Sequence, residues 1–558
     1  MRRLQSLLKK WVSWPVVRHA AALALFTASF CALLLPKLLP ARSGQILSNS
    51  PADGAILLWS LGWWPHAVAH GILVPYTHAV FAPDGTNLAW TTSVPTAGFL
   101  MAPVTRAFGV FAAFNALALL APVSAAWTMY LLVHRVTRRW WPSLAAGLLF
   151  ALSPLETSEV AIGHLNLSLT ALVPMAAYLV VRHLEGSIRP AVLVPLLGVV
   201  LAAEIGVSTE VFATTTLFGG LALLLLYAFD RPRRGALRST AKVVGAGYVA
   251  AGVLASPLLY AALVLRRPPG LASAGHAPAP FSGVETHVSP HLGTLRAGLL
   301  HPSGPGSWVA TVVLALPLFA ILAHLAWTKR RGPVLRALAA TAGVALLCSV
   351  GVLVVGHTTV PTPWALARHL PFLGLIRPQR LSLFVWLIAA AGAGVWLAAR
   401  ERSPWSWGAG ALAIAALLPA MWWGAWTSVV PAPAWAADPP FRPGENVAVV
   451  AGPGPRARQL EDLAFPTVWQ AESGFTFRLA NAYVGSFPPP LPLAVRQFEF
   501  ARPLGPAQAR DVLAWLHQAG VRSVVVMRPA NAVVGSVHRL LGTDPVPVGT
   551  VVLFRVPG

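Results

Sequence analysis

Charged side chains are scarce in this sequence. Asp, Glu, Lys and Arg together make up 11% of its 558 residues, against roughly 25% in an ordinary soluble domain. Hydrophobic residues make up 56% of the chain. A soluble fold cannot bury such a large apolar share, so the composition excludes an ordinary soluble enzyme.

Cysteine is nearly absent, and two features of other protein classes are missing. Cys31 and Cys348, the only two cysteines, fall in apolar segments far apart in the sequence, so neither a disulfide framework nor a cysteine metal site is indicated. The sequence contains no glycine-rich phosphate loop and no internal repeat. These absences argue against a nucleotide-binding fold and against a repeat protein.

Long apolar runs dominate the chain instead. A helix needs about 20 mostly apolar residues to cross a bilayer, because every backbone N–H and C=O group must be bonded within the segment. We predict eleven spans, at 19–39, 108–133, 142–155, 167–183, 190–205, 211–229, 243–265, 308–328, 334–356, 381–399 and 405–427. Three of them (142–155, 167–183 and 190–205) are short, so we expect them to extend at an edge, tilt or re-enter.

The basic residues follow a topological pattern. The formal net charge of +23 would suit a nucleic-acid partner. However, most basic residues gather at alternate ends of the predicted spans, in 1–18, 134–139, 182–189, 230–242, 329–336 and 400–402. This bias fits the positive-inside rule with a cytoplasmic N-terminus. The charge therefore requires no nucleic acid, and an odd number of spans places the C-terminal region outside.

Three long outer loops interrupt the membrane part, which we predict to cover 1–427. They lie at 40–107, 266–307 and 357–380. The first is rich in tryptophan and proline. The helical spacing of its apolar residues (Ile56, Trp59, Trp63 and Ala67) predicts an interfacial helix, and Pro95 opens a second one at 95–107.

The composition changes after the last predicted span. Residues 428–444 form a proline-rich linker. Residues 445–558 then alternate short buried-strand patterns with an amphipathic helix, which predicts a small α/β domain. The predicted fold class is therefore a multi-pass α-helical membrane protein of about 11 spans with a small C-terminal α/β extracytoplasmic domain.

Carboxylates gather on the predicted outer side of the membrane part. Asp53, Glu156, Glu159, Glu204 and Glu210 lie at or near the outer ends of spans. A carboxylate costs up to about 3 kcal/mol at mid-membrane, so acids kept there either cap helix ends or line a cavity. Clustering on one face favours a catalytic role for at least one of them. Asp53 is the leading candidate, and it could equally serve as an N-cap.

Other polar residues accompany these acids. His164 and Asn166 lie in a short loop beside Glu156 and Glu159, and we expect all four side chains to shape one cavity. His66 and His70 are four residues apart on one helical face. They are either metal ligands or polar residues of the interfacial helix.

Arginines at the outer ends of spans are candidates for phosphate binding. Arg377 and Arg380 lie at the mouth of the tenth predicted span, against the positive-inside trend, and Arg266 and Arg267 are placed similarly. Planar guanidinium groups suit a phosphate or diphosphate head group. The alternative is that these side chains only snorkel to the membrane interface.

Several segments of the sequence resemble one enzyme superfamily. They are NSPADGAILLWSLGWWPHAVAHG after the first span, FAPDGTNLAW and VPTAGFLMAPVTRAFG before the second span, and LPFLGLIRPQRLSLF before the tenth. With the span layout, they resemble the GT-C superfamily of membrane glycosyltransferases, which use polyprenyl-phosphate sugars. The C-terminal run WQAESGFTFRLANAYVG resembles the outer domain of bacterial polytopic proteins of this kind, which is taken to help hold acceptor or polymer.

The resemblance assigns roles to the acids. By position, Asp53 matches the aspartate of the first outer loop, which serves as general base or metal contact in the superfamily. Glu156 and Glu159 match a second acidic site in the next outer loop. The familiar paired-acid motif is not matched, because Gly and Ala follow Asp53. Whether a divalent metal takes part is therefore left open, and the metal and other cofactors are unknown.

The function implied is the transfer of a sugar from a polyprenyl-phosphate donor to an extracytoplasmic cell-envelope acceptor. The expected partners are the polyprenyl-phosphate-linked sugar, membrane lipid and a glycan, lipid or protein acceptor, with no nucleic acid. The expected location is the bacterial cytoplasmic membrane, with the N-terminus cytoplasmic and the C-terminal domain outside. Two alternatives stay open: a polytopic lipid or glycan transporter or flippase, and a non-enzymatic scaffold for envelope assembly.

Overall fold

The computed structural model describes residues 14–39, 42–265, 285–287, 307–329, 332–355, 358–360, 362–367, 376–423, 426–485 and 491–557. The described chain is mostly helical and divides into two compact units. Over their described residues, the first comprises Met1–Lys37, Ala118–Ala255 and Ala277–Trp426, and the second comprises Leu38–Leu117, Ser256–His276 and Thr427–Gly558. The second unit therefore combines most of the first predicted outer loop with the C-terminal region.

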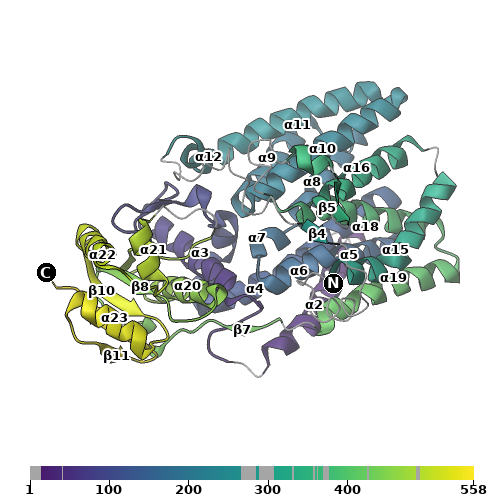
Figure 1. Ribbon diagram of the computed structural model, residues 1–558. Coiled ribbons are helices and arrows are strands. Elements are labelled where there is room, and N and C mark those ends of the chain that lie inside the picture. Colours follow the sequence, from purple (N-terminus) through teal and green to yellow (C-terminus); the bar gives the residue numbers. More distant parts are fainter. Residues whose placement is uncertain are drawn as a thin grey trace, which may run out of the picture. The chain divides into compact units, whose positions relative to one another are not determined.

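The first unit is a bundle of helices (Figure 1). They are α2 (Trp14–Leu34), the later part of α4 (Pro95–Thr137), α5 (Trp140–Ala151), α6 (Pro154–Ile162), α7 (Leu165–Ser168), α8 (Leu172–Leu184), α9 (Pro190–Val207), α10 (Thr209–Phe229), α11 (Arg234–Leu254), α15 (Ser307–Lys329), α16 (Pro333–Ser349), α17 (Pro363–Ala367), α18 (Ser382–Ala399) and α19 (Pro404–Trp423). The short strands β4 (Glu285–His287), β5 (Val352–Val355) and β6 (Thr358–Val360) form one small sheet.

The apolar helices fit a membrane-embedded chain. Among the described residues, seven helices are long and apolar enough to cross a bilayer, or up to nine if each of two bent pairs forms one span. One bent pair joins α5 and α6 at an angle of 48°. Shorter apolar helices cover Ala315–Lys329 and Pro333–Ser349. A helix covers most of each predicted span, and the number of eleven crossings stays a prediction.

Small residues allow close helix packing in this bundle. Helix α9 packs against α8 and α11 through a core that includes Leu197 and Ala251. A Cβ atom on Gly198 would lie 2.7 Å from the Cβ of Ala250, and one on Gly247 would lie 2.9 Å from a methyl group of Leu197. Glycine is thus required where these backbones approach, as is common between membrane helices.

Helix α4 contains one sharp break. Gly109 has φ 82° and ψ 172°, a conformation almost confined to glycine. The segment before it begins at Pro95, as predicted, and exposes Phe99, Leu100 and Phe108. Contact of this apolar face with the membrane interface stays a prediction.

The second unit contains a five-stranded sheet in the order β11-β12-β10-β8-β9. The strands are β8 (Asn446–Val450), β9 (Arg478–Leu479), β10 (Val521–Val526), β11 (Val546–Val548) and β12 (Val551–Arg555). Strand β8 pairs in parallel with β9 and β10, whereas β12 is antiparallel to β10 and β11. An α/β arrangement thus occupies the region where the sequence patterns predicted it.

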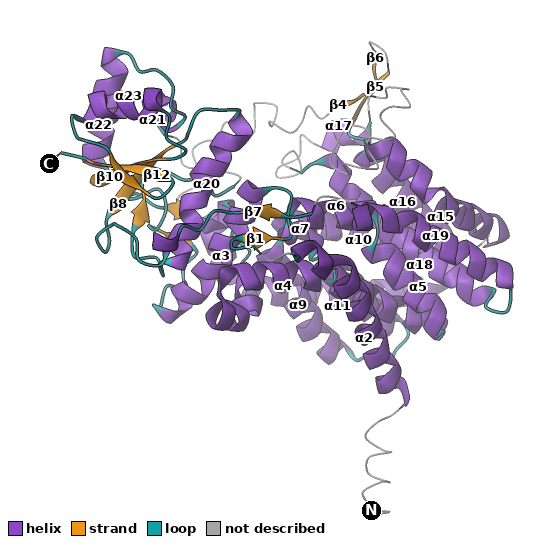
Figure 2. Cartoon of the chain, turned by 90° about the horizontal axis from the view of Figure 1, so that it is seen from below, coloured by secondary structure: helices purple, strands orange, loops and turns teal. Residues whose placement is uncertain are grey.

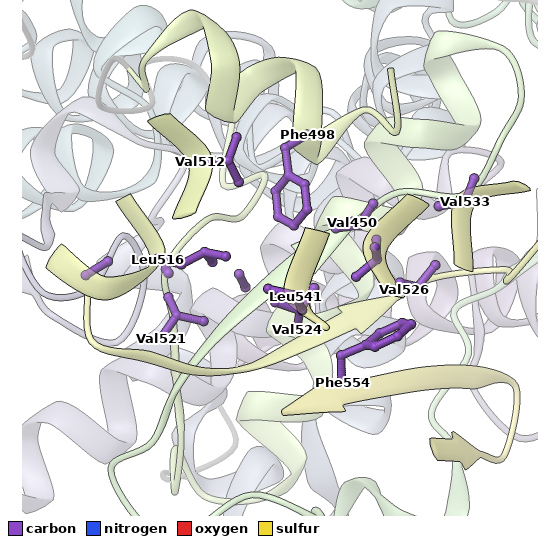
Figure 3. Close-up of a cluster of buried hydrophobic side chains, with 14 of the residues drawn as sticks. Val450, Phe498, Val512, Leu516, Val521, Val524, Val526, Val533, Leu541 and Phe554 are labelled. Atoms are coloured by element: carbon purple, nitrogen blue, oxygen red, sulfur yellow. The ribbon is translucent and has the colours of Figure 1, made fainter. Parts of the chain in front are cut away.

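Helices cover this sheet. They are α20 (Arg456–Glu472), α21 (Leu493–Glu499), α22 (Pro506–Gln518) and α23 (Asn531–Leu541). Figure 2 shows α21, α22 and α23 grouped beside the strands β8, β10 and β12. In the close-up of Figure 3, Val450, Val524 and Val526 from the strands meet side chains of these helices, including Phe498 and Leu516. Alternate strand residues thus point into one apolar core.

Residues of the first outer loop share a core with the C-terminal region. Helix α3 (Pro51–Ala69) packs against α20, and β1 (Gln45–Ile46) pairs with β7 (Ser428–Val429). The indole Nε1 of Trp59 donates to Gln470 Oε1 at 2.8 Å, and Gln470 Nε2 donates to the carbonyl of Ala79 at 2.7 Å. These contacts are buried, so the two sequence segments fold together.

The prediction that the helix at the start of this loop is interfacial is wrong. Every residue from Gly54 to Pro65 is buried, so α3 is covered around its whole circumference. The predicted apolar face, which includes Trp59, is present, but the opposite face is apolar or small as well. A helix that is hydrophobic all round is typical of a protein interior.

Candidate functional site

The segment between α5 and α8 brings the predicted polar residues of the first unit together. Ser153 caps α6, its hydroxyl accepting from the Glu156 amide, and Pro154 follows at the first helical position, where its missing N–H costs nothing. Gly163 ends the helix in the left-handed conformation, with φ 82°. The chain then turns so that the His164 amide donates to the Glu159 carbonyl at 2.9 Å.

Glu159 and His164 form a close pair. The Nδ1 atom of His164 lies 2.7 Å from Oε2 of Glu159, and the carboxylate side chain is only 10% exposed. An ionised carboxylate can only accept a hydrogen bond, so Nδ1 carries the proton. The pair thus fixes the tautomer and orientation of the imidazole.

Arg380 extends this pair into a network across three segments. It lies in the 3₁₀ helix η5 (Pro378–Leu381), directly before α18. Its Nη1 donates to Glu210 Oε2 at 2.6 Å, and its Nε lies 3.5 Å from Glu159 Oε1. The side chains of Arg380 and Glu210 are both 19% exposed. One guanidinium therefore faces two largely buried carboxylates.

Glu156 lies deeper in the same region. It is 2% exposed, and Thr170 Oγ1 donates to its Oε2 at 2.9 Å. Its Oε1 and the hydroxyl of fully buried Ser168 find no hydrogen-bond partner among the described residues. Asn166 lies in α7 beside them, half-buried. The four residues predicted as a secondary polar site thus lie within one short stretch, and Glu159 and His164 are in direct contact.

Glu210 also belongs to the network. The sequence predicts it only as one of several acids at the outer end of a span. The structure places it in the first turn of α10, where a carboxylate also suits the positive helix end. Its partner, Arg380, is 170 residues away in sequence. No local pattern could have revealed this pair.

Glu204 is a separate buried acid on α9. It is 1% exposed, and Thr215 Oγ1 donates to its Oε1 at 3.1 Å. Its Oε2 has no hydrogen-bond partner in the described part of the chain. Thr215, which makes this hydrogen bond, lies on the adjoining helix α10.

The predicted arginines have different surroundings. Arg377 is exposed at the position before η5, and the backbone amide of Arg380 donates to its carbonyl at 3.0 Å. The predictions for Arg266 and Arg267 fall outside the described residues. Of the four candidates for phosphate binding, Arg377 and Arg380 lie among the described residues, and Arg380 forms ion pairs with Glu159 and Glu210.

Asp53 belongs to the second unit. It lies in the first turn of α3, half-buried, and the Ser50 hydroxyl donates to its Oδ2 at 2.7 Å. The N-cap position is taken by Ser50, so the alternative of Asp53 as N-cap is wrong.

The donor set was also tested for metal binding. His66 and His70 stack with ring centroids 4.1 Å apart, beside Phe475. Within the described ranges, no group of three or more His, Cys, Asp or Glu side chains could hold a metal ion.

Comparison with known proteins defines the class of fold. No family model and no curated protein matches the sequence. Solved structures of GT-C glycosyltransferases, however, match the structure over almost the whole chain. The protein therefore has the GT-C glycosyltransferase fold, as the resemblance of its sequence predicted, and it is a multi-pass membrane protein.

Three solved structures illustrate the match. The arabinofuranosyltransferase AftD from Mycobacteria has a TM-score of 0.58 at 16% identity over 96% of this chain. The oligosaccharyltransferase AglB from Archaeoglobus fulgidus, solved with an inhibitory peptide and a dolichol-phosphate, has a TM-score of 0.51 at 13% identity over 91% of this chain. ArnT from Cupriavidus metallidurans, bound to undecaprenyl phosphate, has a TM-score of 0.50 at 14% identity over 95% of this chain.

The matched chains differ in length. This chain covers 40% of AftD, 69% of AglB and 97% of ArnT. It thus spans about two fifths of the length of AftD. At these sequence identities the likeness shows the fold, and activity has to be argued from the residues of this chain.

Proposed function

We propose that the protein transfers a sugar from a polyprenyl-phosphate donor to an acceptor on the outer side of a bacterial cytoplasmic membrane. The observation that carries the proposal is the network of Glu159, His164, Glu210 and Arg380, placed at the ends of apolar helices in a GT-C fold. Ion pairs are expensive in a membrane protein and are usually kept for function. Two matched proteins, AglB and ArnT, were solved with polyprenyl phosphates.

The topology proposed from the sequence completes this function. With eleven spans and a cytoplasmic N-terminus, α6, the start of α10 and η5 lie at the outer surface. A lipid-linked donor presented there needs no soluble nucleotide sugar. The region 445–558 would then lie outside, where it can bind a glycan, lipid or protein acceptor.

Asp53 is the proposed general base. Its carboxylate takes the proton from an acceptor hydroxyl, and the oxygen attacks the anomeric carbon of the donor sugar. The bond between this carbon and the phosphate oxygen breaks, and polyprenyl phosphate leaves with the electron pair. The hydrogen bond from Ser50 supports this role, because it orients the carboxylate of Asp53. A single displacement of this kind inverts the anomeric configuration.

The basic segment Arg377–Arg380 would stabilise the phosphate as its negative charge develops. Glu156, Glu159, His164 and Asn166 would line a polar region where hydroxyl groups of the sugar can bind. The pairing of Glu159 with His164 supports this, because it holds the imidazole in one orientation.

The test is transfer of labelled sugar from a panel of polyprenyl-phosphate donors in proteoliposomes. We expect transfer by the wild type and a loss of roughly a hundredfold or more in Asp53→Asn, the usual contribution of a general base. Asp84→Asn is the matched control, because Asp84 is an exposed acid of the same loop. If Asp53→Asn is folded and as active as wild type, Asp53 is not the base. If the wild type transfers sugar from no donor, the proposed function is wrong.

A further inference from the structure

The two central parallel strands of the second unit end beside each other at one edge of the sheet. Strand β8 lies between β9 and β10, and Val450 pairs with Val526 at the ends of β8 and β10 (Figure 3). The chain leaves β8 toward β9 on one side and leaves β10 toward β11 on the other. In open α/β sheets, ligands bind outside the carboxyl ends of the strands at such a switch of direction. The loops at this edge are therefore where a ligand is expected.

Three segments meet at this edge. A Cβ atom on Gly452 would lie 2.8 Å from the Met527 carbonyl oxygen, so glycine is required for the loops after β8 and β10 to approach this closely. The side chain of Gln459 donates from Nε2 to the Phe500 carbonyl at 3.0 Å, which ties in the segment after α21. The edge therefore joins parts of the second unit that are far apart in the sequence.

Guanidinium groups gather around these loops. Arg528 Nη2 donates to the Arg458 carbonyl at 2.9 Å, and Arg458 itself is exposed in the first turn of α20. The guanidinium carbon of Arg456 lies 4.8 Å from the centroid of the Phe500 ring. Stacking on an aromatic ring holds a planar guanidinium in one orientation. Together with one exposed arginine of α21, these residues form what we call the arginine edge: Arg456, Arg458, Arg496 and Arg528.

The carboxylates near the arginine edge compensate only part of its charge. Three of them interact with these arginines, namely Asp462, Glu461 and Glu499. The Asp462 side chain is 1% exposed and is already held by Arg528. Burial raises the pKa of Glu499 to about 7, so this carboxyl is only partly ionised at neutral pH. Four guanidiniums thus face fewer than three full negative charges, and the edge is positive toward solvent.

We propose that the arginine edge binds an acidic glycan, and that the acceptor of the proposed transfer is therefore a polysaccharide that carries carboxylate or phosphodiester groups. The inference deepens the proposed function and rests on it. A guanidinium binds such an anion through two parallel N–H bonds. Arginines from three segments offer several separate contacts, which suits a chain with repeated charges.

A membrane surface is the alternative partner for exposed basic side chains. Surface-bound segments gain binding strength from apolar side chains that enter the lipid as well as from charge. The exposed residues between β8 and α20 are instead Pro453, Gly454 and Pro455. Among the described residues of 445–558, the exposed large apolar side chains are Leu493, near Arg496 on α21, and Val546, on the far strand β11. One leucine offers little apolar area, so the edge favours the glycan.

The experiment measures the binding of two labelled acidic probes, oligogalacturonate and an oligomer of glycerol phosphate, to the full-length protein in phosphatidylcholine nanodiscs. Methyl-esterified oligogalacturonate is the neutral probe. We expect at least one acidic probe to bind roughly tenfold or more tightly than the neutral one, as for the gain of a charge-assisted hydrogen bond. Added salt should weaken this binding, because exposed charges are screened.

Variants of the exposed arginines locate the binding. Arg456→Gln combined with Arg458→Gln should raise the Kd for the acidic probe roughly tenfold or more and leave binding of the neutral probe unchanged. Arg456→Lys keeps the charge without the planar fork and should give an intermediate Kd. Arg522→Gln is the matched control and should bind like wild type, because Arg522 is an exposed arginine at the opposite end of β10. Thermal unfolding followed by tryptophan fluorescence checks that each variant is folded.

Three results would overturn the assignment. If neither acidic probe binds better than the neutral one, the edge holds no anion site. If Arg522→Gln weakens binding as much as the double variant, overall charge rather than this edge is responsible. If the double variant binds the acidic probes like wild type but loses binding to phosphatidylglycerol vesicles, the edge is a membrane-binding surface.

The transfer assay keeps the two proposals apart. Sugar transfer by the wild type to uncharged acceptors alone would refute the acidic glycan and leave the proposed function standing. Binding of an acidic probe that depends on Arg456 and Arg458, without sugar transfer from any donor, would refute the proposed function and leave the binding site standing. If both proposals hold, the double variant should raise the KM for the acidic acceptor and leave kcat unchanged.

Discussion

Glu499, the last residue of α21, offers a pH-dependent test of the structure of the second unit. Burial raises the pKa of this carboxyl to about 7, although Arg496, a hydrogen bond with Asn481 and Arg456 act in the opposite direction. Its Oε2 has no hydrogen-bond partner among the residues that the structure describes. The native fold therefore favours the protonated carboxyl.

The sign and size of the effect follow from this pKa. Because the folded value lies above the ordinary value of 4.5, Glu499 contributes stability below about pH 4.5, and this contribution is lost as the pH rises through 7. A shift of one pKa unit corresponds to about 1.4 kcal/mol. The free energy of unfolding of the second structural unit should therefore fall by about 3 kcal/mol between pH 4.5 and pH 8. Glu499→Gln removes the titrating group and should abolish this loss.

Hydrogen exchange of the Ala451 amide is the direct readout, because this N–H donates to the Glu499 carbonyl at 2.8 Å. We expect protection in the wild type to fall between pH 5 and pH 8, after correction for intrinsic exchange, and to stay level in Glu499→Gln. Asp544→Asn is the control, since the Asp544 side chain is 96% exposed. If wild type and Glu499→Gln show the same dependence on pH, or the variant is less protected at pH 8, the reasoning fails.

Two further substitutions test a buried ion pair of the second unit and the turn that ends helix α6. Arg528→Met should destabilise the second unit by about 3 kcal/mol, because it removes the cation that pairs with a buried carboxylate. Arg528 Nη2 lies 2.8 Å from Oδ2 of Asp462, whose side chain is 1% exposed. Faster exchange of the Gly452 amide, which donates to Asp462, would show this, and unchanged exchange would contradict it. Gly163→Ala should lower the free energy of unfolding by about 1–2 kcal/mol, because Gly163 adopts the left-handed backbone conformation, which is strained for alanine. The measurement is the thermal unfolding midpoint in detergent, and an unchanged midpoint would disprove the assigned turn.

Features of the site that depend on residues close together in the sequence can be predicted from the sequence. Ser153, Pro154 and Gly163 delimit α6 by their own backbone preferences, and the five-residue spacing between Glu159 and His164 allows one turn to bring them together. These contacts are local, so a pattern of residue types is enough to suggest them. The acids were recognised for the same reason, because a carboxylate in an apolar helix stands out.

The packing inside the second unit could not be predicted in this way. Helix α3 was predicted to lie on the membrane because its apolar spacing suits an interfacial helix. The partner that covers it, α20, lies in the C-terminal region, and the Trp59–Gln470 hydrogen bond joins residues 411 positions apart. An apolar helix surface indicates that something covers it, and the choice between lipid and protein depends on the rest of the chain.

The sequence by itself determined the membrane helices, because each must satisfy its own backbone hydrogen bonds within one apolar segment. It also determined the candidate acids, because a carboxylate is conspicuous against 56% hydrophobic residues. Only the tertiary structure decided that Glu210 pairs with Arg380 and that Arg377 remains exposed. The physical reason is that an ion pair depends on distance in space, and three segments far apart in the chain had to pack before these charges could meet.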